Sequence, residues 1–450
     1  MKITGQIVAC GPVLARTCFD LRPTAALLLC LLLLPVPLRA AEEFSFDVAA
    51  FEKKPLEWGG YLELKGEHSD INQDGAMGRL NLYRQPRATL DRLGGTVQLD
   101  GRYQQGIAAA NWLLRASASQ DDLAWQDQAD IFAAYASLKP SPQISLDLGK
   151  KVFKWGKGYA WNPVGFIDRP KDPDDPEEAM EGFVGAGLDL VRSFAEGPLK
   201  SAALTTVALP VWQGVNEDFG ERDNLNFAAK LYLLYRDTDL DFMLFSGNSR
   251  TPRYGLDFSR NLATNLEIHG ELAHTPRQPV RLLLADNSVA NLEVSDTSWL
   301  LGLRYLSARE LTTIVEYYHN GDGYSEEELG RFFNLVADGY QQFTTTGATT
   351  LLNKAANVSR AYSRPQAGRN YLYLRLNQKE PFDLLYFNPG LTAIVNLDDQ
   401  SWSLSPEALY TGFTNWELRL RFTALNGGSA DEYGNKQNRN KLEARLRYFF

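Results

Sequence analysis

The final segment of the sequence alternates between apolar and polar side chains. One set of alternate positions carries Leu442, Ala444, Leu446, Tyr448 and Phe450, and the positions between them are mostly charged. Successive side chains of a β-strand point to opposite faces, so this pattern predicts a strand with one apolar and one polar face. A fold that accepts this segment must offer it an apolar environment on one side and a polar one on the other.

Segments with the same period recur along the chain. In Asn265–Thr275 and Trp416–Ala424, apolar side chains alternate with charged ones. Counting such segments, among them Met77–Asp91 and Gly95–Gln104, predicts about 18 strands, within a range of about 16–18, and single-chain bacterial barrels have an even number. A charged face of this kind does not suit a dry core, because burying an unpaired charge is costly. We therefore expect the charged face to meet water or to form a paired network.

The connections between the predicted strands alternate in length. Short ones include Asp237–Thr238 and Ser307–Arg309, and long ones include Gln105–Asp127, Lys154–Phe183, Pro276–Asp296 and Asn320–Arg369. Short turns at one end and long loops at the other are typical of transmembrane barrels, with the short turns in the periplasm. The fold class expected is therefore all-β, a transmembrane antiparallel β-barrel with short periplasmic turns and long extracellular loops.

The N-terminal region has the features of a secretory signal peptide. The apolar run Ala25–Leu38 follows basic residues and precedes small ones, and it is too short for a transmembrane helix. We expect residues 1–40 to be this signal, 41–55 to be a periplasmic lead, and 56–450 to be the barrel. The three cysteines all fall in the segment expected to be removed, at Cys10, Cys18 and Cys30. The mature chain then needs no disulfide.

Composition narrows the classes of function. The formal net charge is −9, which disfavours nucleic-acid binding because that depends on basic residues neutralising phosphates. Mean hydropathy is −0.30, and no second long apolar run follows the N-terminal one. In a barrel, apolar lipid-facing residues alternate with polar lumen-facing ones, so the average hydropathy of a membrane-spanning strand can be low. A low mean hydropathy is therefore compatible with a membrane location.

Charged residues on the polar face are candidates to line a pore. The acidic and histidine candidates lie in the middle of the chain, and the basic ones lie in the last two predicted strands: Asp239, Asp241, Glu267, His269, Glu271, Arg419, Arg421, Arg445 and Arg447. If the two groups face each other, they set a transverse field across the lumen that favours polar or charged solutes. The alternative is that they form salt bridges between adjacent strands.

The segment Lys154–Phe183 combines an aromatic, glycine-containing turn with four prolines and a run of acids. Proline fixes the backbone, so this long connection is expected to be rigid. By count it is the third outer loop, and by analogy with general porins we expect it to fold inward and constrict the pore. A rigid external loop is the alternative. The constriction candidates are Lys154, Trp155, Tyr159, Trp161, Asp168 and Arg169.

Two further features of the long loops suggest structure or binding. Ser325 and Glu328 form a capping box before apolar residues at helical spacing, which predicts one short amphipathic helix within 320–369, packed across the barrel mouth or inside it. Carboxylates at Asp172, Asp174 and Asp175 offer oxygen ligands to a hard cation. Their spacing matches no calcium loop, so we predict no metal site.

Catalytic motifs are weak. The histidines His68, His269, His274 and His319 lie outside any nucleophile elbow, H-E-x-x-H or Cys-His arrangement. His269 between Glu267 and Glu271 is the best candidate for a base. We predict that the chain is not an enzyme and needs no cofactor, with an outer-membrane protease or phospholipase as the alternative.

Taken together, the alternating segments and the aromatic final strand resemble a porin-like Gram-negative outer-membrane β-barrel. The resemblance implies location in the outer membrane, lipid as a partner, and recognition of Tyr448 and Phe450 by the barrel assembly machinery. A looser similarity to alginate-export-like barrels covers Asn396–Ser401, Pro406, Tyr410 and Asn415–Leu418. The expected function is facilitated diffusion of small polar or charged solutes. Export of an anionic polysaccharide and a closed structural or enzymatic barrel are the alternatives, and the oligomeric state is left open.

Overall fold

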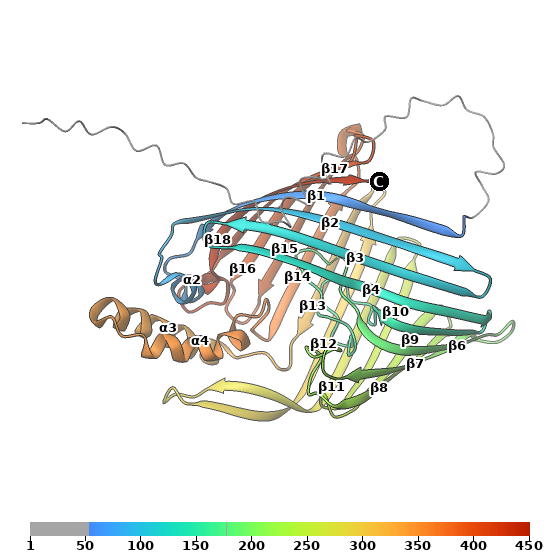
Figure 1. The fold of residues 1–450 in the computed structure, drawn as a ribbon, viewed down its shortest axis with the longest axis horizontal. Helices are drawn as coiled ribbons and strands as arrows, with labels where there is room; N and C mark the ends of the chain where they lie inside the picture. Colours follow the sequence, from blue (N-terminus) through green and yellow to red (C-terminus); the bar gives the residue numbers. More distant parts are fainter. Residues whose placement is uncertain (1–53, 177) are drawn as a thin grey trace, which may run out of the picture. The chain divides into compact units, whose positions relative to one another are not determined.

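A computed structural model describes residues 54–176 and 178–450, so the predicted signal peptide and most of the predicted lead lie outside the described residues. The described chain forms one antiparallel sheet of 18 strands (Figure 1). Each strand pairs with its neighbours in sequence, and β1 pairs with both β2 and β18. The sheet is therefore closed into a barrel, and the predicted all-β barrel with 18 strands is confirmed.

The strands run without interruption around the ring. The first nine are β1 (Leu56–Ile71), β2 (Thr89–Gln105), β3 (Ala108–Asp121), β4 (Trp125–Ser141), β5 (Ile144–Lys151), β6 (Phe183–Ser193), β7 (Leu199–Val211), β8 (Asn224–Tyr235) and β9 (Thr238–Ser246). The second nine are β10 (Arg253–Ala263), β11 (Leu266–Leu283), β12 (Val289–Leu306), β13 (Leu311–His319), β14 (Asn370–Gln378), β15 (Phe387–Asn396), β16 (Trp402–Tyr410), β17 (Trp416–Asn426) and β18 (Asn438–Phe449).

The longest connections all lie at one end of the barrel, as expected, although some connections at that end, such as 122–124, are short. One end, here called the short-turn end, has turns such as 106–107 and 236–237; the other, the long-loop end, carries 72–88, 152–182 and 320–369. Among the described residues, none of the helices has the length and apolarity required to cross a membrane. The strands instead give the chain an apolar outer face.

Alternation places apolar side chains on the outside of the ring. On β17, Trp416, Leu418, Leu420 and Phe422 are exposed, whereas Arg421 is buried. Exposed aromatic residues occur near both ends of the strands, with Phe227, Tyr254 and Trp299 towards the long loops and Trp58, Tyr103, Tyr235 and Tyr305 towards the short turns. An apolar band between two aromatic belts is the exterior of an outer-membrane-type barrel.

Three local predictions are wrong. The segment 77–91 is not a strand, because Gly75 precedes a helix, α2 (Ala76–Leu82), and β2 begins only at Thr89. The expected loop 105–127 contains β3, whose small residues gave a weak apolar signal. The expected loop 276–296 is a continuation of the β11–β12 hairpin, paired as far as Leu283 and Val289. The first two errors cancel in the strand count.

The connection 320–369 holds two helices instead of one short helix. Helix α3 (Glu326–Thr346) starts at the predicted capping box of Ser325 and Glu328, which is confirmed, and α4 (Thr350–Tyr362) follows it. Gly347 ends α3 in the left-handed conformation that favours glycine. Among the described residues, two short 3-10 helices, η2 (Pro381–Asp383) and η3 (Tyr433–Asn435), lie in other connections.

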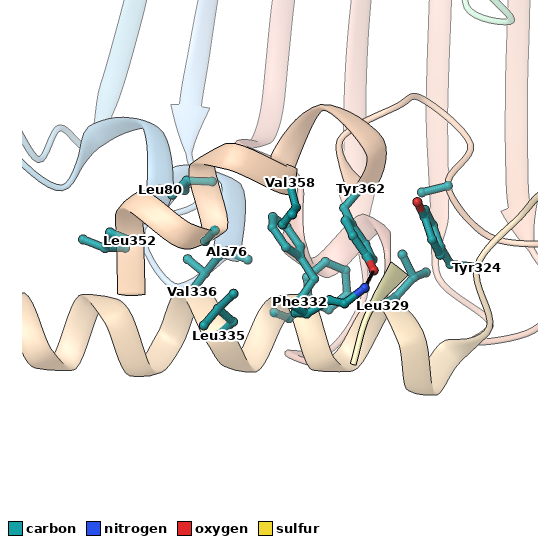
Figure 2. Close-up of a cluster of buried hydrophobic side chains, with 14 residues drawn as sticks. Ala76, Leu80, Tyr324, Leu329, Phe332, Leu335, Val336, Leu352, Val358 and Tyr362 are labelled. Atoms are coloured by element: carbon teal, nitrogen blue, oxygen red, sulfur yellow. Dashed lines mark hydrogen bonds between the residues drawn. The ribbon is translucent and has the colours of Figure 1, made fainter. Parts of the chain in front are cut away.

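The helices pack together at the long-loop end rather than inside the barrel. Figure 2 shows the apolar side chains of α3 and α4 meeting those of α2, with Phe332 and Tyr362 stacked 4.7 Å apart. The hydroxyl of Tyr362 accepts a hydrogen bond from the backbone N–H of Leu283 in the β11–β12 hairpin. The helices therefore form a core of their own outside the lumen, and a different connection, residues 152–182, contacts the inner wall.

Candidate functional site

The connection between β5 and β6, residues 152–182, contacts the inner wall of the barrel on several sides. It makes side-chain or backbone contacts with β3, β9, β11, β13, β17 and β18. It is the third connection at the long-loop end, as counted from the sequence. The first part of this loop, residues 153–169, is called the aromatic part, and the second, residues 172–178, is called the acidic part. The two parts contact the wall in different ways.

The aromatic part docks on two carboxylates of the wall. Glu271 of β11 accepts hydrogen bonds from the backbone N–H groups of Lys157 at 2.6 Å and Gly158 at 2.5 Å. Glu316 of β13 accepts from the N–H of Ala160 at 2.8 Å and also from that of Tyr159. Buried N–H groups need acceptors, so these carboxylates replace the partners that a regular strand or helix would provide.

Two glycines make this close approach feasible. A Cβ on Gly156 would lie 2.6 Å from a carboxylate oxygen of Glu271, and its φ of +102° favours glycine. A Cβ on Gly158 would lie 2.3 Å from the carbonyl oxygen of Trp161. The glycine-containing turn noted in the sequence therefore allows the backbone to dock against the barrel wall.

The two tryptophans of this part are buried in separate apolar clusters. Trp155 packs with Val164, Phe166 and Ile167 of the same loop against inward residues of β7–β9. Trp161 lies against three wall tyrosines, stacked 5.0 Å from Tyr318 and in edge contact 5.7 Å from Tyr373. Burying a large aromatic side chain stabilises its position by about 1.5–3 kcal/mol, so these contacts fix the loop.

Polar groups complete the anchor. Asp168 accepts hydrogen bonds from the N–H groups of Phe153, Lys154 and Trp155. These bonds lower the pKa of Asp168, but burial raises it by more, so the pKa is raised overall. Burial disfavours the charged form of Lys157, but the carboxylates around it, first of all Asp241 at 3.0 Å, together outweigh burial, so the pKa of Lys157 is raised. Arg169 forms ion pairs with Asp218 and Glu181.

The acidic part of the loop reaches the opposite side of the ring. Asp175 lies 3.0 Å from Arg419 and 3.2 Å from Arg445, bridging β17 and β18. Glu178 pairs with Arg115 of β3 at 2.9 Å. These contacts are ion pairs between side chains, whereas the aromatic part is held through its backbone. The side chains of Asp175, Arg419 and Arg445 are only 6–11% exposed, so the Asp175 pairs are largely buried, and Glu178 is the more exposed partner at 40%.

The basic wall is a paired network. Glu407 of β16 lies within 3.0 Å of Arg375, Arg419 and Arg421. Arg445 also pairs with Glu443 at 3.0 Å, and Arg447 pairs with Glu63 of β1. The five arginines thus face Glu407, Glu443, Glu63 and Glu417 of the wall and Asp175 of the loop, so carboxylates balance their charge. The predicted salt bridges between strands are therefore present on this arginine-rich side of the lumen.

The acidic wall is built by strand register. Asp241, Asp257 and Glu271 stand directly beside one another on β9, β10 and β11, and all three are buried. Asp239 accepts a hydrogen bond from Tyr232, and Glu267 accepts one from Ser259. His269 lies 2.8 Å from Glu316. Strands β9–β11 are about half a ring away from β18 and β1, so acidic and basic groups lie on opposite sides.

The structure brings the sequence candidates into one network. The nine pore-lining candidates all occupy the inner face, and Lys157 joins the loop to Asp241. Sequence reasoning missed the residues that organise this network, listed here: Glu63, Arg115, Asp175 as an ion-pair partner, Asp257, Glu316, Arg375 and Glu407. Strand parity would have placed most of them inside, but it could not have named their partners.

A cavity of about 720 Å³ remains in the lumen near the short-turn end. It lies on the inner face of β2–β6, where Arg102, Tyr135, Asp147 and Asp189 line it. Its lining mixes both signs of charge with neutral polar groups. Within residues 54–176 and 178–450, no group of three or more His, Cys, Asp or Glu side chains is arranged to hold a metal ion.

No protein-family model and no curated protein matches the chain. Among solved structures, Pseudomonas aeruginosa OccK11 (OpdR) is 13% identical, with 87% of this chain and 95% of that chain covered and a TM-score of 0.48. Acinetobacter baumannii OccAB3 is 10% identical over 88% and 99%, with a TM-score of 0.49. A triple mutant of Rhodopseudomonas blastica porin is 10% identical over 88% and 100%, at 0.43. The fold assignment rests on the strand pairing described above.

Proposed function

We propose that the chain is an outer-membrane channel for facilitated diffusion of small polar or charged solutes, constricted by the loop 152–182. The observation that supports this most is a charged lumen crossed by a loop that is held to both walls. A barrel that served only as a scaffold would gain nothing from opposed acidic and basic walls. A solute crossing between them meets a transverse field that favours dipolar and charged molecules.

Export of an anionic polymer is less well supported. A polymer track requires basic groups available along the path, and Arg375, Arg419 and Arg421 share one carboxylate, Glu407. Arg445 and Arg447 are also ion-paired. Diffusion of a small solute requires only local rearrangement of such pairs. The expectation that the chain is not an enzyme stays a prediction.

Single-channel recording of the refolded chain in a planar bilayer tests the proposal. Discrete conductance steps are expected. Ion selectivity should fall as the salt concentration rises, because salt screens the charged side chains of the walls. Silence from protein that is folded, as judged by heat-modifiable gel mobility, would contradict a channel and favour a closed barrel.

Charge variants then test the constriction. Asp175→Asn removes a carboxylate beside Arg419 and Arg445, so the selectivity should shift towards anions. Asp338→Asn removes an exposed charge of α3 and serves as the matched control. A reversal potential that is unchanged when both Arg419 and Arg445 become Glu would argue against any selectivity role of the basic wall.

A further inference from the structure

The connection between β14 and β15, residues 379–386, presents large apolar side chains at the short-turn end. Phe382 is 94% exposed and Leu385 is 64% exposed, and Leu384 and Tyr386 are exposed as well. The other short turns include the two-residue connection Arg236–Asp237, which is polar. An exposed apolar group of this size marks a surface that contacts another apolar phase or partner.

The backbone of this connection is ordered in an unfavourable conformation. Glu380, Phe382, Asp383 and Tyr386 all have positive φ, between 40° and 65°. Non-glycine residues with large side chains rarely adopt this conformation, and such outliers are a reason to look for function. Hydrogen bonds hold it: the N–H of Tyr386 donates to the Glu380 carboxylate at 2.8 Å, and the N–H of Thr411 donates to the carbonyl of Tyr386 at 3.1 Å.

The second bond ties the connection to its neighbour, the β16–β17 turn. There Phe413 is 63% exposed and packs edge-on against Tyr410 at 5.4 Å. Tyr410 pairs with Phe387 across β15 and β16, and exposed Trp416 follows at the start of β17. The exposed side chains of 382–386 and Phe413 therefore continue the aromatic belt of the barrel exterior at its short-turn end.

We propose that the surface formed by Phe382, Leu384, Leu385, Tyr386 and Phe413 inserts into the interfacial region of the periplasmic phospholipid leaflet. Continuity with the belt that meets lipid selects this occupant over a periplasmic protein or a second copy of the chain. Aromatic and leucine side chains partition favourably into the boundary between headgroups and acyl chains. The connection then anchors the short-turn end at a fixed depth in the membrane.

Site-directed spin labelling tests the depth of this surface. Residues 54–450 contain no cysteine, so replacing Cys10, Cys18 and Cys30 by Ser leaves a chain into which single cysteines can be placed. Phe382→Cys and Leu385→Cys carry a nitroxide in separate samples, and Asp237→Cys on the β8–β9 turn is the control. The protein is refolded into vesicles of phosphatidylethanolamine and phosphatidylglycerol, and folding is verified by heat-modifiable mobility.

At both test positions the nitroxide should be relaxed more by oxygen, which enriches in lipid, than by a water-soluble nickel chelate. At Asp237→Cys the order should be reversed. Nickel access at the test positions equal to that of the control would overturn the proposal and favour a periplasmic partner. Exclusion of both reagents would also overturn it, and would indicate a contact with a second copy. The readout does not depend on conductance, so it stands or fails separately from the channel function.

Discussion

At the scale of single residues, Glu271 and Glu316 act as acceptors for backbone N–H groups of the loop. The sequence marked Glu271 as a pore-lining charge, and strand parity does place it inside. Its carboxylate is nevertheless occupied by Lys157 and Gly158, at 2.6 and 2.5 Å. A charged residue on a lumen face can therefore be a structural ligand for a loop rather than a contact for solute.

Gly158→Ala should undock the aromatic part of the loop. The added methyl group would meet the carbonyl of Trp161, so the backbone must move. Forcing an extra methyl group into such a packed site typically destabilises by about 1–3 kcal/mol. We expect a lower free energy of unfolding in urea and larger conductance steps. Gly66→Ala, where the methyl group meets nothing within 4 Å, is the control, and equal effects of the two variants would refute the docking role.

Asp174→Asn should stabilise the protein more as pH rises. Burial, followed by the neighbouring Asp172, raises the pKa of Asp174 above its ordinary 3.8. The folded state therefore holds the proton more tightly, so stability is lost as pH rises from the unfolded pKa through the raised folded pKa. The asparagine variant lacks this loss. Urea unfolding at acidic and at neutral pH measures the free energy of unfolding of the variant and of the unmodified protein. The prediction fails if the difference between the two proteins does not grow with pH, or if exposed Asp338→Asn shows the same difference.

At the scale of elements, local sequence patterns predict where α3 begins but not what α3 and α4 pack against. The capping box at Ser325 marks the start of α3 in the sequence, since its hydrogen bonds are local. The core beneath the helices also contains Ala76 and Leu80 of α2 and Leu283 of β11. These residues are far apart in the sequence, so no local pattern predicts that they meet.

Ser325→Ala should loosen the first turn of α3. The Ser325 hydroxyl accepts a hydrogen bond from the backbone N–H of Glu328. In return, the backbone N–H of Ser325 donates to the Glu328 carboxylate at 2.7 Å. Loss of a side-chain cap costs about 1 kcal/mol, so amide hydrogen exchange in this turn should accelerate about fivefold. Ser359→Ala within α4 is the matched control. Unchanged exchange at 326–329 would show that packing alone holds the helix start.

At the scale of the whole molecule, closure of the ring joins the two ends of the described chain. β18 pairs with β1 and β17, and the N–H of Phe450 donates to the carbonyl of Gly60 at 3.1 Å. The aromatic rings of Phe450 and Trp58 lie 6.1 Å apart. The same final strand is therefore a lipid-facing element and the seam of the barrel.

Phe450→Ala tests the proposed role of the final aromatic residue in assembly. Its side chain is half-exposed, and its backbone hydrogen bond persists in alanine, so the stability of protein refolded in detergent should change little. Recognition of the final strand in cells should suffer instead, which lowers the heat-modifiable fraction in the outer membrane. Phe422→Ala, similarly exposed on β17, is the control. Equal loss for both variants would remove the assembly role.

The sequence by itself determined the barrel, the inner and outer faces and the start of α3, whereas the number of strands agreed because two errors cancelled. These features follow from periods of two or 3.6 residues and from local caps, which are written in neighbouring positions. The errors at 77–91 and 105–127 arose where alternation was weak or accidental. Only the tertiary structure decided which charges meet across the lumen. Asp175 and Arg419 are 244 residues apart, and their contact exists because closing the ring brings both to the same space.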